Sequence, residues 1–288
     1  MGTFLETIVA ATSEELARRQ VETPVERLVE MIGYCAPPRD FVGAISRGDA
    51  RVAPTEGVVH RPYASDKRRG IRLIAEVKRA SPSKGGLNES ADAASLAREY
   101  ERGGASAISV LTEPRFFKGK LQDLAAAASA VRIPVLRKDF ILEAYQVYES
   151  RAFGADAILL IAAILSDEQL ARLVDLAGWL GMGALVEVHD DVELDRVIGK
   201  VKDLRRSACP VALGVNNRDL KDFAVNLERT FSLRPRVPEG VTLVSESGVR
   251  SREDVLRLEL AGVDAILVGE TLVTSPDPQS AIRCLLGW

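Results

Sequence analysis

The chain has 288 residues, of which 47% are hydrophobic and 27% are charged, a composition that is ordinary for a folded globular protein. Its formal net charge of -3 excludes a whole-protein field that attracts nucleic acid or an acidic membrane surface, so any anionic ligand must be bound by a local group of cations. No stretch is apolar for long enough to span a bilayer, and the N-terminal residues lack the basic and apolar regions of a secretory leader.

The cysteines and histidines are few and scattered. Cys35, Cys209 and Cys284 show no CxxC or Cys/His spacing, so we expect neither a disulfide framework nor a metal site, and a reducing cytoplasm fits. His60 and His189 form no metal cluster and no nucleophile triad, and we expect each to be solvated or hydrogen-bonded locally. We therefore predict a cytoplasmic protein without a metal.

The first 70 residues predict a helical extension and a connector. Two apolar stripes at helical spacing indicate about two helices, and such an extension usually packs on the domain that follows. Residues 48–67 contain Gly, Pro and Ser, are only weakly periodic, and read as an exposed connector. The stripes consist of Phe4, Leu5, Ile8 and Val9, and then of Leu28, Met31 and Ile32.

From Ile71 onward, short apolar runs alternate with amphipathic stretches, as in repeated βα units with a parallel sheet. Eight such units predict an α/β fold, a (β/α)8 TIM barrel over residues 71–288, which forms one structural domain with residues 1–70. The rival is an open doubly wound sheet, which usually has fewer strands and a Gly-rich fingerprint after the first. Capping boxes at Ser166 and at Thr23 mark two helix starts. The predicted strands are Ile71–Val77, Ala107–Leu111, Pro134–Leu136, Ala157–Ile161, Ala184–Val188, Val211–Val215, Val241–Ser245 and Ala265–Val268.

Polar side chains stand at the ends of these apolar strands. Glu76 and Lys78 end the first strand, where ionised groups cost desolvation free energy unless something pairs or uses them. In a (β/α)8 barrel the loops after the strands meet on one face, so polar strand ends that are far apart in sequence converge into one pocket. The same pattern recurs at Lys138, Glu187, Asn216 with Arg218, and Glu246 with Ser247.

Three of these side chains have acid–base chemistry. Lys138 is the candidate general acid, because a semi-buried lysine beside other cations is readily tuned as an acid; a surface lysine paired to Asp139 is the alternative. The strand period points Glu187 toward the barrel axis, and Glu187 and Glu76 are either catalytic carboxylates or partners in structural ion pairs. Two carboxylates and two cations in one cavity would push their pKa values apart and so divide acid from base.

Other strand ends offer groups that bind a ligand. Asn216 has both a donor and an acceptor, and Arg218 presents a planar fork to a carboxylate, although Asn-Asn-Arg-Asp alone is only a loop. Gly248 and Gly269 follow the seventh and eighth strands, where barrels bind phosphate through backbone N–H groups; simple tight turns are the alternative. Phe117, after the second strand, either forms a wall of the pocket or anchors its own loop.

In order and spacing, these motifs together resemble the indole-3-glycerol phosphate synthase family of tryptophan biosynthesis, from the N-terminal helices to the last strand. The resemblance implies a decarboxylating ring closure and dehydration of 1-(2-carboxyphenylamino)-1-deoxyribulose 5-phosphate to indole-3-glycerol phosphate, carbon dioxide and water. It implies no cofactor, no metal and no redox step. The matching motifs are Ile74 to Ser83, Leu111 to Glu113, Pro134 to Phe140, Leu185 to Val188, Gly214 to Leu220 and Ser245 to Gly248.

The resemblance also implies roles for single residues. Lys138 would act as general acid on the ribulose carbonyl, while Glu187 and Glu76 serve the proton transfers of ring closure and dehydration; either Lys138 or Glu187 donates the later proton. The expected ligand is a small anion with a carboxylate and a phosphate, and other enzymes of the pathway are candidate partners. Lys78 would bind the anionic substrate and its phosphate, Asn216 and Ser247 would position the substrate, Ser81, Ser83, Phe117, Arg218 and Glu246 would contact it, and Gly248, Gly269 and Glu270 would offer backbone donors to phosphate.

Two other functions remain as alternatives. The first is another phosphosugar-processing TIM barrel enzyme, such as an isomerase of the same pathway, which would use a different acid–base pair at the first strand than Glu76 and Lys78. The second is a non-catalytic barrel that binds a phosphate ligand, which should have lost a charged strand end. None of the expected charged strand ends is missing from the sequence.

Overall fold

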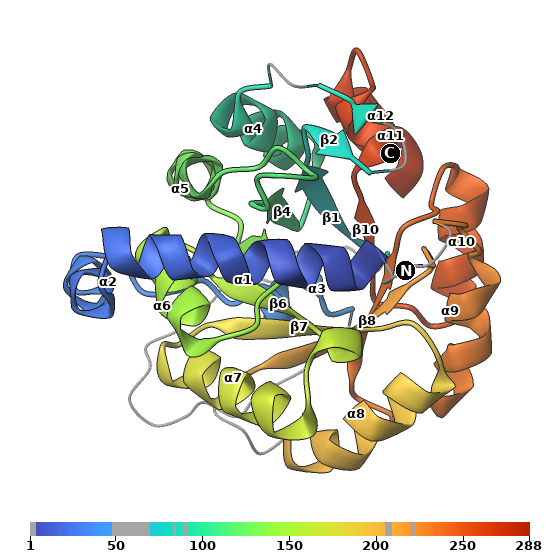
Figure 1. The fold of residues 1–288 in the computed structure, drawn as a ribbon. Coiled ribbons are helices and arrows are strands. Elements are labelled where there is room, and N and C mark those ends of the chain that lie inside the picture. The colour runs from blue at the N-terminus through green and yellow to red at the C-terminus, as the bar shows by residue number, and fades with distance from the viewer. Residues whose placement is uncertain (1–3, 48–69, 83–84, 89–90, 205–208, 220–222) are drawn as a thin grey trace.

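The computed structural model describes residues 4–47, 70–82, 85–88, 91–204, 209–219 and 223–288. Parallel strands form a closed barrel in the order β1-β10-β9-β8-β7-β6-β5-β4, so that the last barrel strand pairs with the first (Figure 1). This is the TIM barrel predicted from the sequence. The strands of the barrel are β1 (Arg72–Val77), β4 (Ala107–Leu111), β5 (Val135–Lys138), β6 (Ala157–Ile161), β7 (Gly183–Val188), β8 (Val211–Asn216), β9 (Thr242–Glu246) and β10 (Ala265–Val268).

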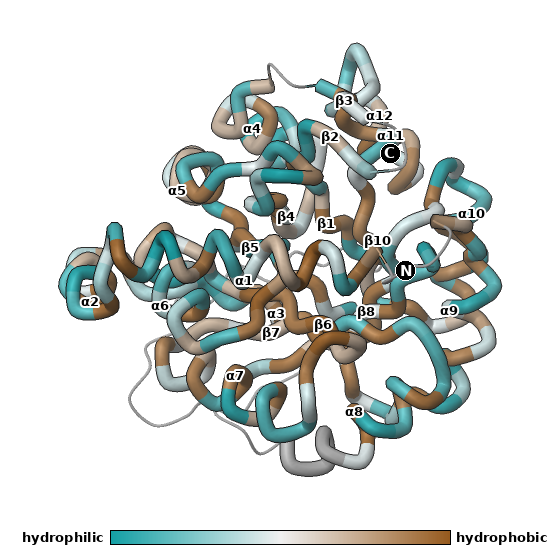
Figure 2. The backbone as a smooth tube through the Cα atoms, in the orientation of Figure 1, coloured by the Kyte–Doolittle hydropathy of each residue, from teal (hydrophilic) through white to brown (hydrophobic). Residues whose placement is uncertain are grey.

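Helices follow the strands and surround the barrel. Figure 2 shows mainly hydrophobic strands, with hydrophilic residues gathered on the surrounding helices and loops. Within the described residues, no helix has both the length and the apolar character needed to cross a membrane. The surrounding helices are α4 (Ala93–Gly103), α5 (Leu121–Ala130), α6 (Ala144–Ala152), α7 (Asp167–Trp179), α8 (Asp191–Leu204), α9 (Glu228–Leu233), α10 (Arg252–Leu260), α11 (Glu270–Val273) and α12 (Pro278–Leu286), with 3-10 turns at Ala162–Ile164 and Arg234–Arg236 and a small antiparallel pair β2 (Ala80–Ser81) and β3 (Gly85–Gly86).

All eight predicted strands are present, and their ends agree with the prediction within two residues. The largest difference is in β5, which continues to Lys138 because its pairing with β4 extends to Leu111. The capping box at the start of α7 is confirmed, since the Ser166 side chain accepts from the backbone N–H of Gln169.

Alternation along the strands sorts side chains to the two sides of the barrel wall. Leu73, Ala75 and Val77 of β1 pack under the helices, whereas Ile74 belongs to the apolar interior and Glu76 follows it on the same side. Glu187 likewise follows the interior residue Leu185, which confirms that it faces the axis. The barrel interior is therefore apolar along most of each strand, and the inward positions at the carboxyl ends of these strands are polar.

Helices from the N-terminal segment cover both ends of the barrel. The short helix α3 (Phe41–Ile45), which the sequence did not predict, packs its apolar face into the interior cluster from the end opposite the polar side chains. The long helix α1 (Phe4–Glu22) crosses the face with the polar strand ends (Figure 1), where Phe4 stacks edge-on against Phe116 and Phe223. The predicted connector at residues 48–67 lies outside the described residues.

The predicted capping box at Thr23 was wrong. The backbone N–H of Thr23 donates to the carbonyl of Arg19 at 2.8 Å, so Thr23 closes the last turn of α1. The next helix, α2 (Val25–Ile32), begins after Pro24 without a side-chain cap.

A buried ion network ties α1 to the barrel beside Lys138. The Arg137 side chain is fully buried, and its guanidinium lies 2.9 Å from both Asp139 and Glu149. Glu149 also pairs with Arg19 of α1 at 2.6 Å. The alternative in which Asp139 pairs with Lys138 is therefore wrong, because Asp139 forms an ion pair with Arg137 and accepts a hydrogen bond from the Thr112 hydroxyl.

We expect Arg137→Gln to lower the free energy of unfolding by about 3–5 kcal/mol, because it leaves Asp139 and Glu149 buried with too little positive charge. Chemical denaturation would measure this change. The matched control is Arg27→Gln, which breaks an exposed pair with Glu30 and should leave the free energy of unfolding within experimental error of the wild type. Equal stability of the two variants would contradict the prediction.

Candidate active site

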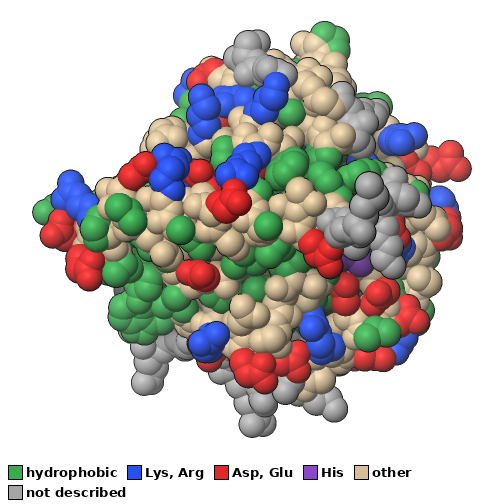
Figure 3. Space-filling model, viewed as in Figure 1, with side chains coloured by type: hydrophobic (Ala, Val, Ile, Leu, Met, Phe, Trp, Pro, Cys, Tyr) green, Lys and Arg blue, Asp and Glu red, His purple; other side chains and the backbone are tan. Residues whose placement is uncertain are grey.

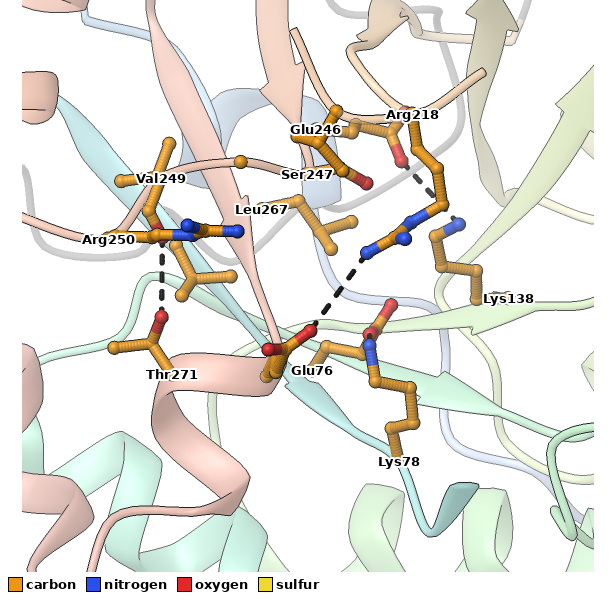
Figure 4. Close-up of a pocket in the computed structure, with 15 residues that line it drawn as sticks. Glu76, Lys78, Lys138, Arg218, Glu246, Ser247, Val249, Arg250, Leu267 and Thr271 are labelled. Atoms are coloured by element: carbon orange, nitrogen blue, oxygen red, sulfur yellow. Dashed lines mark hydrogen bonds and ion pairs between the residues drawn. The ribbon is translucent and has the colours of Figure 1, made fainter. Parts of the chain in front are cut away.

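The polar strand ends meet in one pocket at the carboxyl ends of the strands, as Figure 4 shows. Lys138 extends from β5 toward Glu187 of β7 and Glu246 of β9, with nitrogen–oxygen distances of 3.5 and 3.6 Å. Both glutamates are almost completely buried, at 2% and 1% exposed. These distances are longer than good hydrogen bonds, so the ammonium attracts both carboxyl groups while keeping donors for a ligand.

The first strand adds a second ion pair to this pocket. Lys78 lies 2.8 Å from the carboxylate of Glu76, and both residues line the pocket. The backbone of Gly269 at the end of β10 runs directly behind this carboxylate. A Cβ atom on residue 269 would collide with Glu76 Oε1, so the glycine leaves room for the carboxylate in its observed position.

The buried charges shift one another's pKa values. Burial opposes ionisation of Glu187, but the charges of Lys138 and His189 outweigh it and hold the pKa of Glu187 well below its usual range. Burial and the neighbouring Glu187 charge raise the pKa of Glu246 to about 8. Burial also opposes the charge of Lys138, yet the surrounding carboxylates raise its pKa above the usual value. In Glu76, burial is outweighed by Lys78 and Lys138, and the pKa is lowered.

These shifts correct two expectations. From the sequence, other cations were expected to make Lys138 a stronger acid, but its nearest charges are carboxylates and the shift has the opposite sign. The acid and the base were also expected to separate among Glu76, Glu187 and the cations. The pair whose pKa values diverge is instead Glu187 and Glu246, and Glu246 had been expected only to contact the substrate.

One half of the pocket is polar and is built from the loops after β8, β9 and β10. Ser247 and Gly248 have positive φ angles of 64° and 92°, which turn the chain sharply at the end of β9. The amide of Asn217 donates to the carbonyls of Glu246 and Ser247 and so holds this turn. The lining of this half comprises Glu76, Lys78, Lys138, Arg218, Val225, Glu246, Ser247, Gly248, Val249, Arg250, Leu267, Val268, Gly269, Glu270 and Thr271.

The other half of the pocket is mainly apolar. Phe117 and Phe140 stand beside each other with ring centroids 6.2 Å apart. The other apolar residues of this wall are Pro82, Leu111, Leu159, Ile161 and Phe223. Phe117 thus lines the pocket, and its backbone N–H also donates to Glu113. The two halves share Glu76, Lys78, Lys138, Arg218 and Ser247, which lie where they meet.

The described residues from the predicted site all line this pocket. Asn216 and Ser81 lie in the apolar half, while Arg218 bridges both halves and approaches the carboxylate of Glu270 at 4.0 Å. Ser83 lies outside the described residues.

Sequence reasoning missed several residues of this site. Gly214 of β8 faces inward, and a Cβ there would collide with Glu246 Oε1, so this glycine makes room for the buried acid. The strand period could have signalled it, because Gly214 occupies an inward position next to Asn216. Arg250 lies in the polar half and Phe140 in the apolar half. His189, for which no role was predicted, lies next to Glu187, with 3.3 Å between its Nε2 and Glu187 Oε1.

Comparisons with known proteins identify the family. The family model described as indole-3-glycerol phosphate synthase matches residues 5–285. The indole-3-glycerol phosphate synthase of Micrococcus luteus is 44% identical over 97% of this chain and 95% of its own length, and that of Pelodictyon phaeoclathratiforme is 43% identical over 95% and 96%. The 3-hexulose-6-phosphate synthase structure from Salmonella typhimurium shares the fold with a TM-score of 0.58 and 15% identity, over 75% of this chain and 97% of that chain. The chain belongs to the indole-3-glycerol phosphate synthase family.

Proposed function

We propose that the chain converts 1-(2-carboxyphenylamino)-1-deoxyribulose 5-phosphate to indole-3-glycerol phosphate, carbon dioxide and water. The observation that carries this proposal is a set of buried groups that keep unused hydrogen-bonding capacity. Among the described residues, both carboxyl oxygens of Glu246 and one of Glu187 lack a hydrogen-bond partner although they are buried around Lys138. Buried polar atoms of this kind need a partner, and a polar substrate provides one.

The two halves of the pocket suit the two ends of this substrate. The glycine turns at Gly248 and Gly269 and the cations Lys78 and Arg218 are suited to the phosphate and the carboxylate. The apolar wall around Phe117 and Phe140 is suited to the aryl ring. The ribulose carbonyl then lies at the junction of the two halves, next to Lys138.

In the first step, the Lys138 ammonium donates a proton to the ribulose carbonyl oxygen as the aryl carbon that carries the carboxylate attacks the carbonyl carbon. The new carbon–carbon bond closes the five-membered ring, and the carbonyl becomes a hydroxyl. Carbon dioxide then leaves, and the electrons of the broken bond restore the aromatic ring. A fixed positive charge beside the developing alkoxide contributes a few kcal/mol to stabilising this transition state.

In the second step, the hydroxyl leaves as water and the ring loses a proton, so one acid and one base are needed. Glu187, which is held ionised, is the carboxylate available to accept the proton from the ring. Glu246 holds a proton up to about pH 8 and is suited to supply the proton that leaves with the hydroxyl. Glu76 stays ionised and pairs with Lys78 near the substrate.

The proposed substrate also bears on the location of the protein and on its candidate partners. A small anionic substrate needs no basic surface, and charges of both signs are interspersed on the face shown in Figure 3. We infer a cytoplasmic location, in line with the scattered cysteines, and candidate partners among the other enzymes of tryptophan synthesis, one of which must supply the substrate. These two inferences go beyond the family assignment.

We expect the purified protein to generate indole fluorescence from 1-(2-carboxyphenylamino)-1-deoxyribulose 5-phosphate, and Lys138→Met and Glu187→Gln to lower kcat by at least about 100-fold. Each variant loses a proton-transfer group while the pocket keeps its shape. The matched control is Asp195→Asn, which removes an exposed carboxylate on α8 and should keep the wild-type rate. A folded wild type that yields no indole product would overturn the proposed function.

We also expect the stability of the wild type to fall relative to Glu246→Gln as the pH rises from about 5 to 8. A carboxyl whose pKa rises on folding binds more protons in the folded state, so its ionisation destabilises that state with a limiting slope of about 1.4 kcal/mol per pH unit. Denaturation curves at several pH values would measure the difference in the free energy of unfolding. Parallel pH profiles of the two proteins would show that Glu246 is not held protonated.

A further inference from the structure

His189 lies at the end of β7, two residues beyond Glu187, and is almost completely buried at 9% exposed. It lines neither half of the pocket, and the proposed reaction does not use it. Its imidazole is inserted between Glu187 and Glu193, the latter from the first turn of α8.

Both ring nitrogens of His189 face a carboxylate. Nε2 lies 3.3 Å from Glu187 Oε1, and Nδ1 lies 3.2 Å from Glu193 Oε2. The Nδ1 contact is a hydrogen bond, whereas Nε2 lies at ion-pair distance from Glu187 without hydrogen-bond geometry. An ionised carboxylate attracts a ring N–H and repels the lone pair of a bare ring nitrogen, so we expect each nitrogen to carry a proton. A histidine has protons on both nitrogens only as the imidazolium cation, and the geometry therefore indicates a charged ring.

Glu193 is itself held firmly for this contact. Its carboxylate accepts the backbone N–H of His189 at 2.7 Å, and its own backbone N–H donates to Asp190 Oδ1 at 2.9 Å. The carboxylate thus closes a small ring with His189 that fixes both the backbone and the imidazole. Such an anchored partner keeps the imidazole from turning away from Glu187.

The charges around His189 come from several elements. Glu187 faces it from β7 and Glu193 from α8, and beyond Glu187 lie Lys138 of β5 and Glu246 of β9. Burial opposes the imidazolium, but the two facing carboxylates outweigh burial and raise the pKa of His189 to about 10. Each oxygen of the Glu187 carboxylate therefore faces a positive charge, with Oε1 toward His189 and Oε2 toward Lys138.

We propose that His189 is a positioning residue, an imidazolium that bridges Glu193 and Glu187 and holds the Glu187 carboxylate ionised and oriented toward the substrate. The inference rests on the proposed function, in which Glu187 is the base. Lys138 alone does not fulfil this task, because it is shared between Glu187 and Glu246 and donates its proton during the reaction. His189 supplies a second positive charge that does not take part in the chemistry.

The charge of His189 can be read without any turnover. The chain has only two histidines, so the ring ¹⁵N signals of the full-length protein are few, and His60→Asn identifies which belong to His189. We expect both ring nitrogens of His189 to stay protonated at pH 7.5 in the wild type. In Glu193→Gln the ring should lose its proton at a lower pH, because one facing carboxylate is gone. A neutral imidazole at pH 7.5 in the wild type would overturn the inference.

The effect on Glu187 appears in the pH dependence of catalysis. In His189→Gln, the side chain keeps an N–H group that can face Glu187 but carries no charge. We expect the acidic limb of its kcat/KM profile to move upward by about one pH unit or more, since Glu187 becomes easier to protonate. Glu193→Gln should move the limb in the same direction by less, and Asp195→Asn on the same helix should leave it in place.

The outcomes separate the two proposals. A purely structural role of His189 would lower kcat/KM equally at every pH, and an unmoved acidic limb in His189→Gln would refute the positioning role. A wild type without indole synthesis would instead refute the proposed function, while the ring ¹⁵N spectrum would still decide whether His189 is charged.

Discussion

The site depends on burying several carboxyl groups around one ammonium group. Glu76, Glu187 and Glu246 are buried at the carboxyl end of the barrel, where little water is present to stabilise three negative charges. Lys138 lies within 3.6 Å of two of them, and its charge keeps Glu187 ionised. Glu187 also faces His189, so it keeps its charge while the proton stays on Glu246. Acid and base character in this pocket thus follow from an unequal share of positive charge between the two carboxyl groups.

The fold could be predicted almost completely, and the site in large part, because both depend on local sequence patterns. Apolar runs with polar ends mark the strands, and the period of two decides which side chains face the axis, as for Glu187. What the sequence could not provide are distances across the barrel. The contacts of Lys138 with Glu187 and Glu246 join residues from different strands, so the sign of its pKa shift was predicted incorrectly. The case of His189 is different, because both of its partners, Glu187 and Glu193, lie within four residues of it in the sequence, and what the sequence did not reveal is the turn from β7 into α8 that brings them together.

The segment Arg137-Lys138-Asp139 illustrates the same limit. One anion follows two cations, and sequence alone does not say which cation it pairs with. In the structure, adjacent residues face opposite sides of the barrel wall, so Arg137 turns outward to Asp139 and Glu149 while Lys138 turns inward. Through Arg19 and Glu149, the outward network reaches α1, which crosses the mouth of the pocket. The segment that anchors the covering helix is therefore the one that carries Lys138.

The barrel fold is shared by enzymes of other names, so the side chains at the strand ends, and not the fold, must specify the chemistry. A 3-hexulose-6-phosphate synthase has the same barrel at 15% identity, so the barrel alone specifies neither substrate nor reaction. What this chain adds is an apolar wall with Phe117 and Phe140 next to a cluster of buried charges. Glycines at two inward positions leave room for that cluster, Gly214 beside Glu246 and Gly269 beside Glu76. In both cases, a buried glutamate on one strand lies against a glycine on or directly after the adjacent strand, so the two residues depend on each other.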